Sequence, residues 1–146
     1  MAIAITNLRG ECILIARNTD DMNLAMPHNG LYDSAAGQKH DISESEFTQV
    51  QQAEKHLKFD GTSLVYEDVN MSFKDEQDLI TYINIHKTDL EKKVIYLNEG
   101  TLKTDAENYI GILDTFDTSS VSFPMTTSLE KHMSDLGHTV VSSLQL

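Results

Sequence analysis

The side chains best suited to bind metal or to act as nucleophiles are six histidines and one cysteine. Their spacing matches none of the His-x-His, His-Glu-x-x-His or His-x₃-His pairs that bring two imidazoles to one zinc ion. Cys12 lies inside the apolar run Cys12–Ala16, which predicts a buried, unreactive thiol. His86 falls on the apolar face of a predicted helix and is interpreted as a boundary histidine with satisfied hydrogen bonds. We therefore expect no metal site among His28, His40, His56, His86, His132 and His138.

The 23 acidic side chains could instead bind calcium or work in pairs as general acid and base. A calcium loop needs alternating oxygen ligands, a central glycine and a closing glutamate, and the acidic turns at 20–21 and 114–117 lack that order. A catalytic carboxylate pair is positioned by the fold, so sequence spacing leaves it open. Glycine-rich phosphate loops and the Gly-x-Ser-x-Gly nucleophile turn are missing. We expect no catalytic residue, no cofactor and no enzymatic activity.

Charge restricts the classes of partner. The chain has 11 basic and 23 acidic side chains and a formal net charge of −12, so phosphate backbones and anionic lipids are repelled. It has no run approaching the roughly 20 apolar residues that span a bilayer, and Met1–Ile5 does not resemble a signal peptide. We expect protein partners, no direct nucleic-acid or membrane contact, and a location in a virion or the cytoplasm.

Periodicity predicts the elements that must hold any site. Two Ile-rich strands are expected at 3–6 and 11–17, a short helix at 43–53 with Ser43 and Glu46 in capping-box spacing, and a hairpin over Leu57–Tyr66. The main helix is expected at 75–92, with acidic residues in its first turn and lysines at its end.

The remaining stretches are more irregular. We expect a long irregular loop at 18–40, strands at 94–97 and 108–113, a short helix at 128–136 ended by Gly137, and a terminal strand at 139–146. Together the elements predict one small α+β domain over residues 1–146, with mostly antiparallel sheets, one main helix and one or two short ones.

Two of these stretches are candidates for partner contact. A long loop in a compact domain is typical of a binding segment. An apolar terminal strand without guarding charges must pair, either inside its own sheet or with a neighbouring subunit. The candidate contact residues are Met26, Pro27, His28, Asn29, Leu31, Tyr32, Val140, Leu144 and Leu146.

One stretch resembles a known group of proteins. The residues Ile42-Ser-Glu-Ser-Glu-Phe47, followed by Lys58, the turn Asp60-Gly-Thr-Ser-Leu64 and Tyr66, resemble small virion proteins of tailed bacteriophages. The resemblance implies a structural subunit of the head decoration, head–tail connector or tail, acting in a homo-oligomer or a larger assembly. The alternative is an inhibitor or regulator whose acidic surface mimics DNA, with Glu44, Glu46, Asp75, Glu76, Asp78, Asp89 and Glu91 on helix surfaces.

Overall fold

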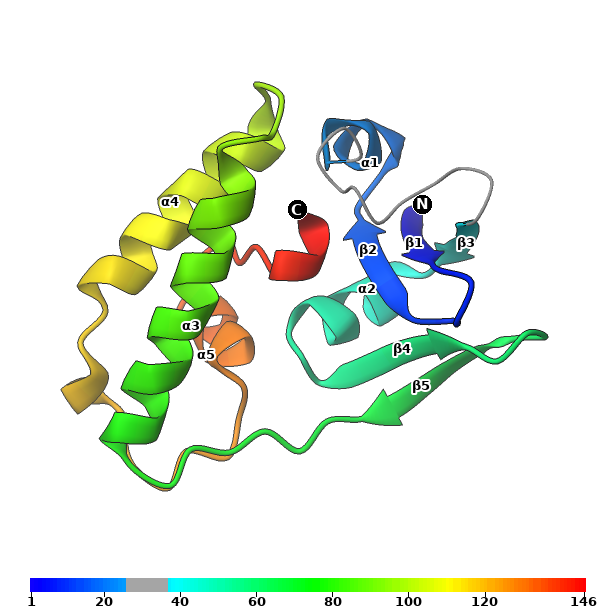
Figure 1. Ribbon diagram of the computed structural model, residues 1–146. Coiled ribbons are helices and arrows are strands. Elements are labelled where there is room, and N and C mark those ends of the chain that lie inside the picture. Colours follow the sequence, from blue (N-terminus) through cyan, green and yellow to red (C-terminus); the bar gives the residue numbers. More distant parts are fainter. Residues whose placement is uncertain (26–36) are drawn as a thin grey trace.

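The computed structural model of the chain describes residues 1–25 and 37–146 (Figure 1). Within these residues, two antiparallel sheets and two short helices lie on one side of the molecule. The helices formed by residues 76–135 lie on the other side, and the C-terminal segment lies between the two groups (Figure 1). Separate helices and antiparallel strands confirm the α+β class.

The first sheet contains three strands in the order β2-β1-β3. β1 (Ala2–Thr6) and β2 (Cys12–Ala16) confirm the two strands expected at the N-terminus. The turn between them is held by Asn7, whose Oδ1 accepts hydrogen bonds from the backbone N–H groups of Arg9 and Glu11, both at 3.0 Å. β1 has a neighbour on each side and all five of its residues are buried, which explains its apolar sequence.

The expectation of one irregular loop over 18–40 is wrong at both ends of that stretch. α1 (Thr19–Ala25) lies at its start and β3 (Gln38–Ile42) at its end. A helix of seven residues has too few apolar positions to show a periodic pattern, and β3 is polar because it pairs only with β1 among the described residues. Residues 26–36 lie outside the described part of the chain.

The next elements agree with the sequence-based predictions. α2 (Glu44–Gln51) begins at a capping box: the Glu46 backbone N–H donates to Ser43 Oγ at 3.1 Å, and the Ser43 N–H donates to Glu46 Oε1 at 2.9 Å. β4 (Lys55–Phe59) and β5 (Leu64–Asp68) form the expected hairpin.

The two sheets are joined at the tip of the first hairpin. Gly10, with φ of +83°, accepts a hydrogen bond on its carbonyl oxygen from the backbone N–H of Phe59 at 2.9 Å. Glu11 forms a bridge with Lys58 next to this contact. The β1–β2 turn therefore packs directly on β4.

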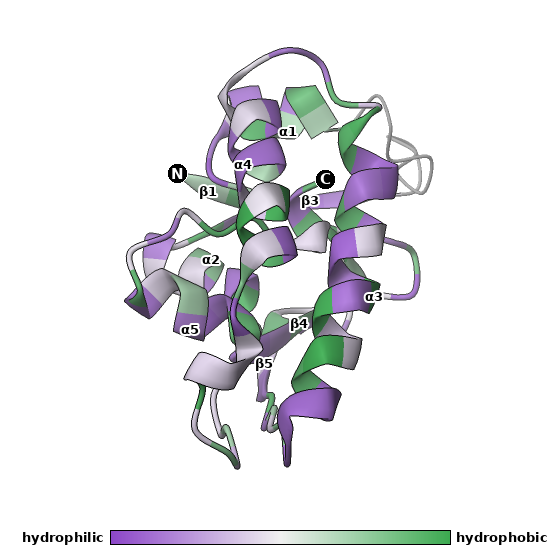
Figure 2. Cartoon of the chain, turned by 90° about the vertical axis from the view of Figure 1, so that its left-hand side faces the viewer, coloured by the Kyte–Doolittle hydropathy of each residue, from purple (hydrophilic) through white to green (hydrophobic). Residues whose placement is uncertain are grey.

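Two long helices cover the other side of the molecule, where one was expected. α3 (Glu76–Val94) confirms the main helix, and Figure 2 shows hydrophobic and hydrophilic residues alternating along it. α4 (Thr101–Thr115) replaces the strand predicted at 108–113, and the strand predicted at 94–97 is the end of α3 and a turn. The buried residues of α4 are spaced four, three and four apart, as on one helix face: Leu102, Ala106, Tyr109 and Leu113.

The end of the chain differs from the prediction. α5 (Leu129–Asp135) confirms the short helix, and Gly137 follows it with φ of +92°. The strand expected at 139–146 is wrong: the segment pairs with no strand among the described residues and contains a short 3-10 helix at Ser143–Gln145. Its apolar residues contact two different parts of the core instead of lining one face of a sheet.

The buried side chains form two hydrophobic clusters. The larger one joins α3, α4, α5 and one face of the first sheet, and the smaller one joins the other face of that sheet to α2 and β4. The C-terminal segment contributes Val140, Val141 and Leu146 to the larger cluster and packs Leu144 against the smaller one. No helix in the described part of the chain is long and apolar enough to cross a membrane.

Candidate functional site

The predicted contact residues fall into two groups. Met26, Pro27, His28, Asn29, Leu31 and Tyr32 lie outside the described residues. The other three are described: Val140 and Leu146 are buried, at 5% and 4% exposure, and Leu144 is half-buried. These three side chains already make contacts inside the chain, because the segment that carries them lies between the helices and the sheets.

The structure brings together one group of side chains with acid–base chemistry. Glu130, on α5, is only 2% exposed. The Tyr82 hydroxyl donates a hydrogen bond to Glu130 Oε1 at 2.6 Å, and His86 Nε2 lies 3.6 Å from the same oxygen. Tyr109, on α4, is fully buried, and its ring lies edge-on to the His86 ring with centroids 6.3 Å apart. We call Tyr82, His86, Tyr109 and Glu130 the buried polar cluster.

Helix geometry positions this cluster. Tyr82 and His86 are four residues apart on α3, so they lie on one face, and their rings stack with centroids 5.7 Å apart. Glu130 is in the first turn of α5. Ser128 caps the start of this helix, and its hydroxyl accepts a hydrogen bond from the Lys131 N–H at 3.1 Å. Capping by Ser128 fixes the start of α5 and so points Glu130 toward α3.

Burial controls the protonation of the cluster. It lowers the pKa of His86, an effect that the negative charges of Glu130 and Asp89 partly offset and that the Lys93 ammonium reinforces. It also raises the pKa of Tyr82, and the adjacent Glu130 carboxylate raises it further. At neutral pH the imidazole is therefore neutral and the hydroxyl is protonated.

The cluster is a poor catalytic centre because Glu130, His86 and Tyr109 are buried and only Tyr82 is partly exposed. Glu130 Oε2, His86 Nε2 and the Tyr109 hydroxyl are buried, and none has a hydrogen-bond partner among the described residues. A substrate would have to displace α5 to reach them. The cluster joins α3, α4 and α5 by polar contacts. The interpretation of His86 as a boundary histidine missed its burial, and no sequence signal marks Glu130 as buried.

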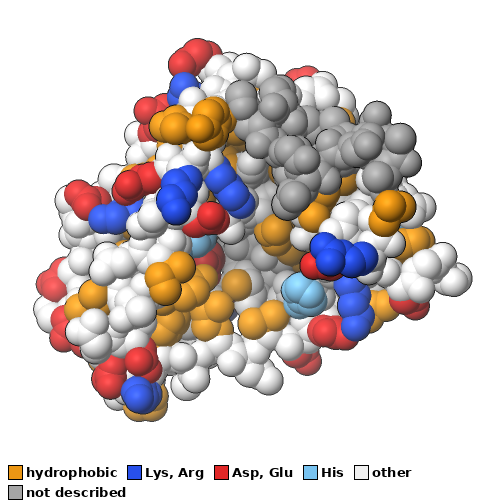
Figure 3. Space-filling model, viewed as in Figure 1, with side chains coloured by type: hydrophobic (Ala, Val, Ile, Leu, Met, Phe, Trp, Pro, Cys, Tyr) orange, Lys and Arg blue, Asp and Glu red, His pale blue; other side chains and the backbone are white. Residues whose placement is uncertain are grey.

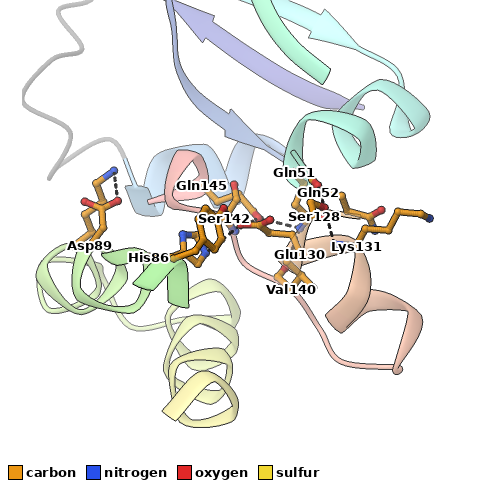
Figure 4. Close-up of polar contacts among 12 residues, drawn as sticks. Gln51, Gln52, His86, Asp89, Ser128, Glu130, Lys131, Val140, Ser142 and Gln145 are labelled. Atoms are coloured by element: carbon orange, nitrogen blue, oxygen red, sulfur yellow. Dashed lines mark hydrogen bonds and ion pairs between the residues drawn. The ribbon is translucent and has the colours of Figure 1, made fainter. Parts of the chain in front are cut away.

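A second set of polar contacts joins the sheets to the helices (Figure 4). The Gln51 side-chain amide donates to the Val140 carbonyl and to Gln145 Oε1, both at 2.9 Å. The Ser142 backbone N–H donates to the same Gln145 oxygen at 2.9 Å. Lys93, at the end of α3, donates to the Ser143 carbonyl at 3.0 Å. The C-terminal segment is therefore held from both sides, which explains its position without strand pairing.

Cys12 and the metal-binding side chains offer no reactive centre in the described residues. Cys12 is half-buried, and burial raises the pKa of its thiol to about 11, so the thiolate is scarce at neutral pH. In residues 1–25 and 37–146, no three His, Cys, Asp or Glu side chains are grouped so that they could hold a metal ion.

The surface offers a different kind of site. Three large apolar side chains at the outer side and end of α3 are more than half exposed: Ile85 at 67%, Ile95 at 66% and Tyr96 at 56%. Ile85 lies on α3, and Ile95 and Tyr96 lie in the turn that follows the last residue of the helix, Val94. We call these three residues the outer face of α3. Figure 3 shows apolar side chains along the side of the molecule that α3 occupies.

His86 predicts a pH dependence of stability. Because its pKa is lower in the folded chain than its usual 6.5, the unfolded chain takes up a proton first as the pH falls. The free energy of unfolding is therefore complete above pH 6.5 and decreases as the pH falls toward the folded pKa. His86→Asn should flatten this part of the curve measured by urea unfolding, whereas the exposed His56→Asn should leave it unchanged. Equal curves for His86→Asn and the native chain would contradict the assignment.

Comparisons with protein-family models, with curated proteins and with solved structures found no match to this chain.

Proposed function

We propose that the chain is a structural or assembly protein that acts through contacts with other proteins. The assembly that fits the sequence resemblance is a bacteriophage virion, in which the chain would serve in head decoration, the head–tail connection or the tail. We propose no catalytic role for the chain, because the acid–base side chains of the buried polar cluster join helices and are largely removed from solvent.

The observation that carries the proposal is the outer face of α3. Exposed apolar side chains are stabilised when a partner removes them from water, and aromatic and apolar anchors of this kind are enriched in protein interfaces. Ile85, Ile95 and Tyr96 are each more than half exposed in the chain by itself. The acidic composition adds solubility and repels nucleic acid and anionic lipid, so the proposed partners are proteins.

The acidic surface gives less support to the DNA-mimic alternative. Acidic residues on the face seen in Figure 3 alternate with basic ones. The acids expected to form a DNA-mimicking surface come from different elements. Glu44 and Glu46 belong to α2, whereas Asp75, Glu76 and Asp78 lie at the start of α3. A DNA mimic needs a continuous acidic surface.

The test compares two exposed apolar side chains changed to the same acid. Ile85→Asp should leave the melting temperature unchanged. It should reduce incorporation by about tenfold or more, as for an interface anchor, when incorporation is measured as cosedimentation with the particle that contains the native chain. Leu8→Asp, at an 83% exposed position in the first turn, is the matched control and should incorporate normally. Normal incorporation of Ile85→Asp, or a native chain that sediments alone as a folded monomer, would overturn the proposal.

A further inference from the structure

β3 lies at the edge of its sheet in the described part of the chain. Within the described residues it pairs with β1 on one side only, so one row of its backbone N–H and C=O groups has no strand partner. Unpaired strand edges recruit other strands unless charge, proline or a covering segment prevents it. β3 contains no proline, and its charged residues are Lys39 and Asp41.

Those two charges lie on one face of the strand. Lys39 and Asp41 are two residues apart, and both side chains are exposed. Neither takes part in an ion pair within the described residues, although most lysines of the chain do. His40 projects to the opposite face, where its Nε2 lies 2.9 Å from Thr6 Oγ1 and its ring packs against Phe59.

Antiparallel pairing of β3 with a second β3 makes these charges complementary. When the two strands are centred on His40, Lys39 lies opposite Asp41 of the second copy, and Asp41 lies opposite its Lys39. Opposite charges directly across an antiparallel pair stabilise it, and like charges destabilise it. The order Lys39-His40-Asp41 therefore fits the twofold symmetry of an isologous dimer, because each lysine lies opposite an aspartate of the other copy.

The other sheet edges lack this property. β5 (Leu64–Asp68) centred on Tyr66 would place Leu64 opposite Asp68 and Val65 opposite Glu67, which pairs apolar with acidic side chains. β2 contacts the 3-10 helix at Ser143–Gln145, and the tip of its hairpin accepts a hydrogen bond from the Phe59 N–H.

We propose that two copies of this chain associate through β3, forming one continuous six-stranded sheet in the order β2-β1-β3-β3-β1-β2. This deepens the proposed assembly function, on which it rests, by naming a second copy of the chain as a partner. Two five-residue strands bury less area than a stable dimer interface. The pairing therefore depends on protein concentration and, because its ion pairs are exposed, weakens with salt.

The test is a charge-swap cycle on the full chain, with the dissociation constant measured by sedimentation at low salt. Lys39→Asp places acids opposite one another at both symmetric positions and should raise the constant by about tenfold or more. Asp41→Lys should do the same by placing lysines opposite one another. The double variant Lys39→Asp/Asp41→Lys restores both opposite-charge pairs, so its dissociation constant should lie within about threefold of that of the native chain.

The exposed Lys92→Asp, on α3, is the control for a change of net charge and should dimerise like the native chain. A monomer at every concentration, or a double variant as weak as the two single variants, would overturn the β3 pairing. Either result leaves the proposed function standing if Ile85→Asp still blocks incorporation, so the two proposals fail separately.

Discussion

Gly10→Ala should destabilise the chain by about 3 kcal/mol or more. A Cβ at this position would lie 2.0 Å from the carbonyl oxygen of Phe59, which is backbone and cannot rotate away. The φ of +83° adds the cost of a left-handed conformation for a residue with a side chain. The hairpin tip would have to leave β4, breaking the hydrogen bond from the Phe59 N–H to the Gly10 carbonyl.

Gly61→Ala is the matched control, measured by the same urea unfolding. Its φ is +98°, but nothing lies within 4 Å of the added Cβ, so only the conformational cost of about 1–2 kcal/mol applies. Equal losses for the two variants would show that the contact between Gly10 and Phe59 contributes nothing, and would contradict the way the two sheets are joined.

Deletion of residues 139–146 should abolish the cooperative fold. The deletion removes Val140, Val141 and Leu146 from the larger hydrophobic cluster, where their exposures are 5%, 0% and 4%. Loss of these three buried side chains at about 1.5–3 kcal/mol each removes roughly 5–9 kcal/mol, which is comparable to the whole stability of a small domain. It also leaves the Gln51 amide without its two acceptors, Val140 and Gln145.

Thermal unfolding followed by circular dichroism measures the effect. Leu136→Ser, at a 54% exposed position just before the deleted segment, should unfold cooperatively near the native temperature. A truncated chain that still melts cooperatively would mean that the C-terminal segment is dispensable to the fold and is available for contacts outside the chain.

Elements with strong local signals could be predicted from the sequence. The capping box of Ser43 and Glu46, the Asp60-Gly61 turn and the charge gradient of α3 each depend on residues close together in the chain. Local hydrogen bonds and helix dipoles act over these short separations, so their sequence pattern is sufficient.

Elements that depend on contacts between residues distant in sequence could not be predicted in this way. Asn108–Leu113 is an apolar run that fits a strand or a helix equally, and it is the packing of α4 against α3 that makes it helical. The terminal segment 139–146 alternates enough to resemble a strand, but Gln51 and Lys93, far away in sequence, hold it in another conformation.

The candidate sites follow the same rule. Glu130 lies in a short amphipathic stretch and is read as an ordinary helix acid, because its partners Tyr82 and His86 come from another helix. β3 could not be recognised as an edge strand, because it overlaps the stretch 18–40 that was predicted to be irregular. Once the register with β1 is known, the spacing of Lys39 and Asp41 becomes informative.

Hydroxyl-radical footprinting of the native assembly tests the assembly role most directly. The reactivity of Ile85 and Tyr96 is compared between the 16.4 kDa chain in isolation and the same chain in the particle isolated from its source. We predict that both side chains, more than half exposed in the isolated chain, become protected in the particle, whereas Leu8 stays reactive. Equal reactivity of Ile85 and Tyr96 in the two samples, or a chain found only as a free monomer, would contradict a role in assembly through the outer face of α3.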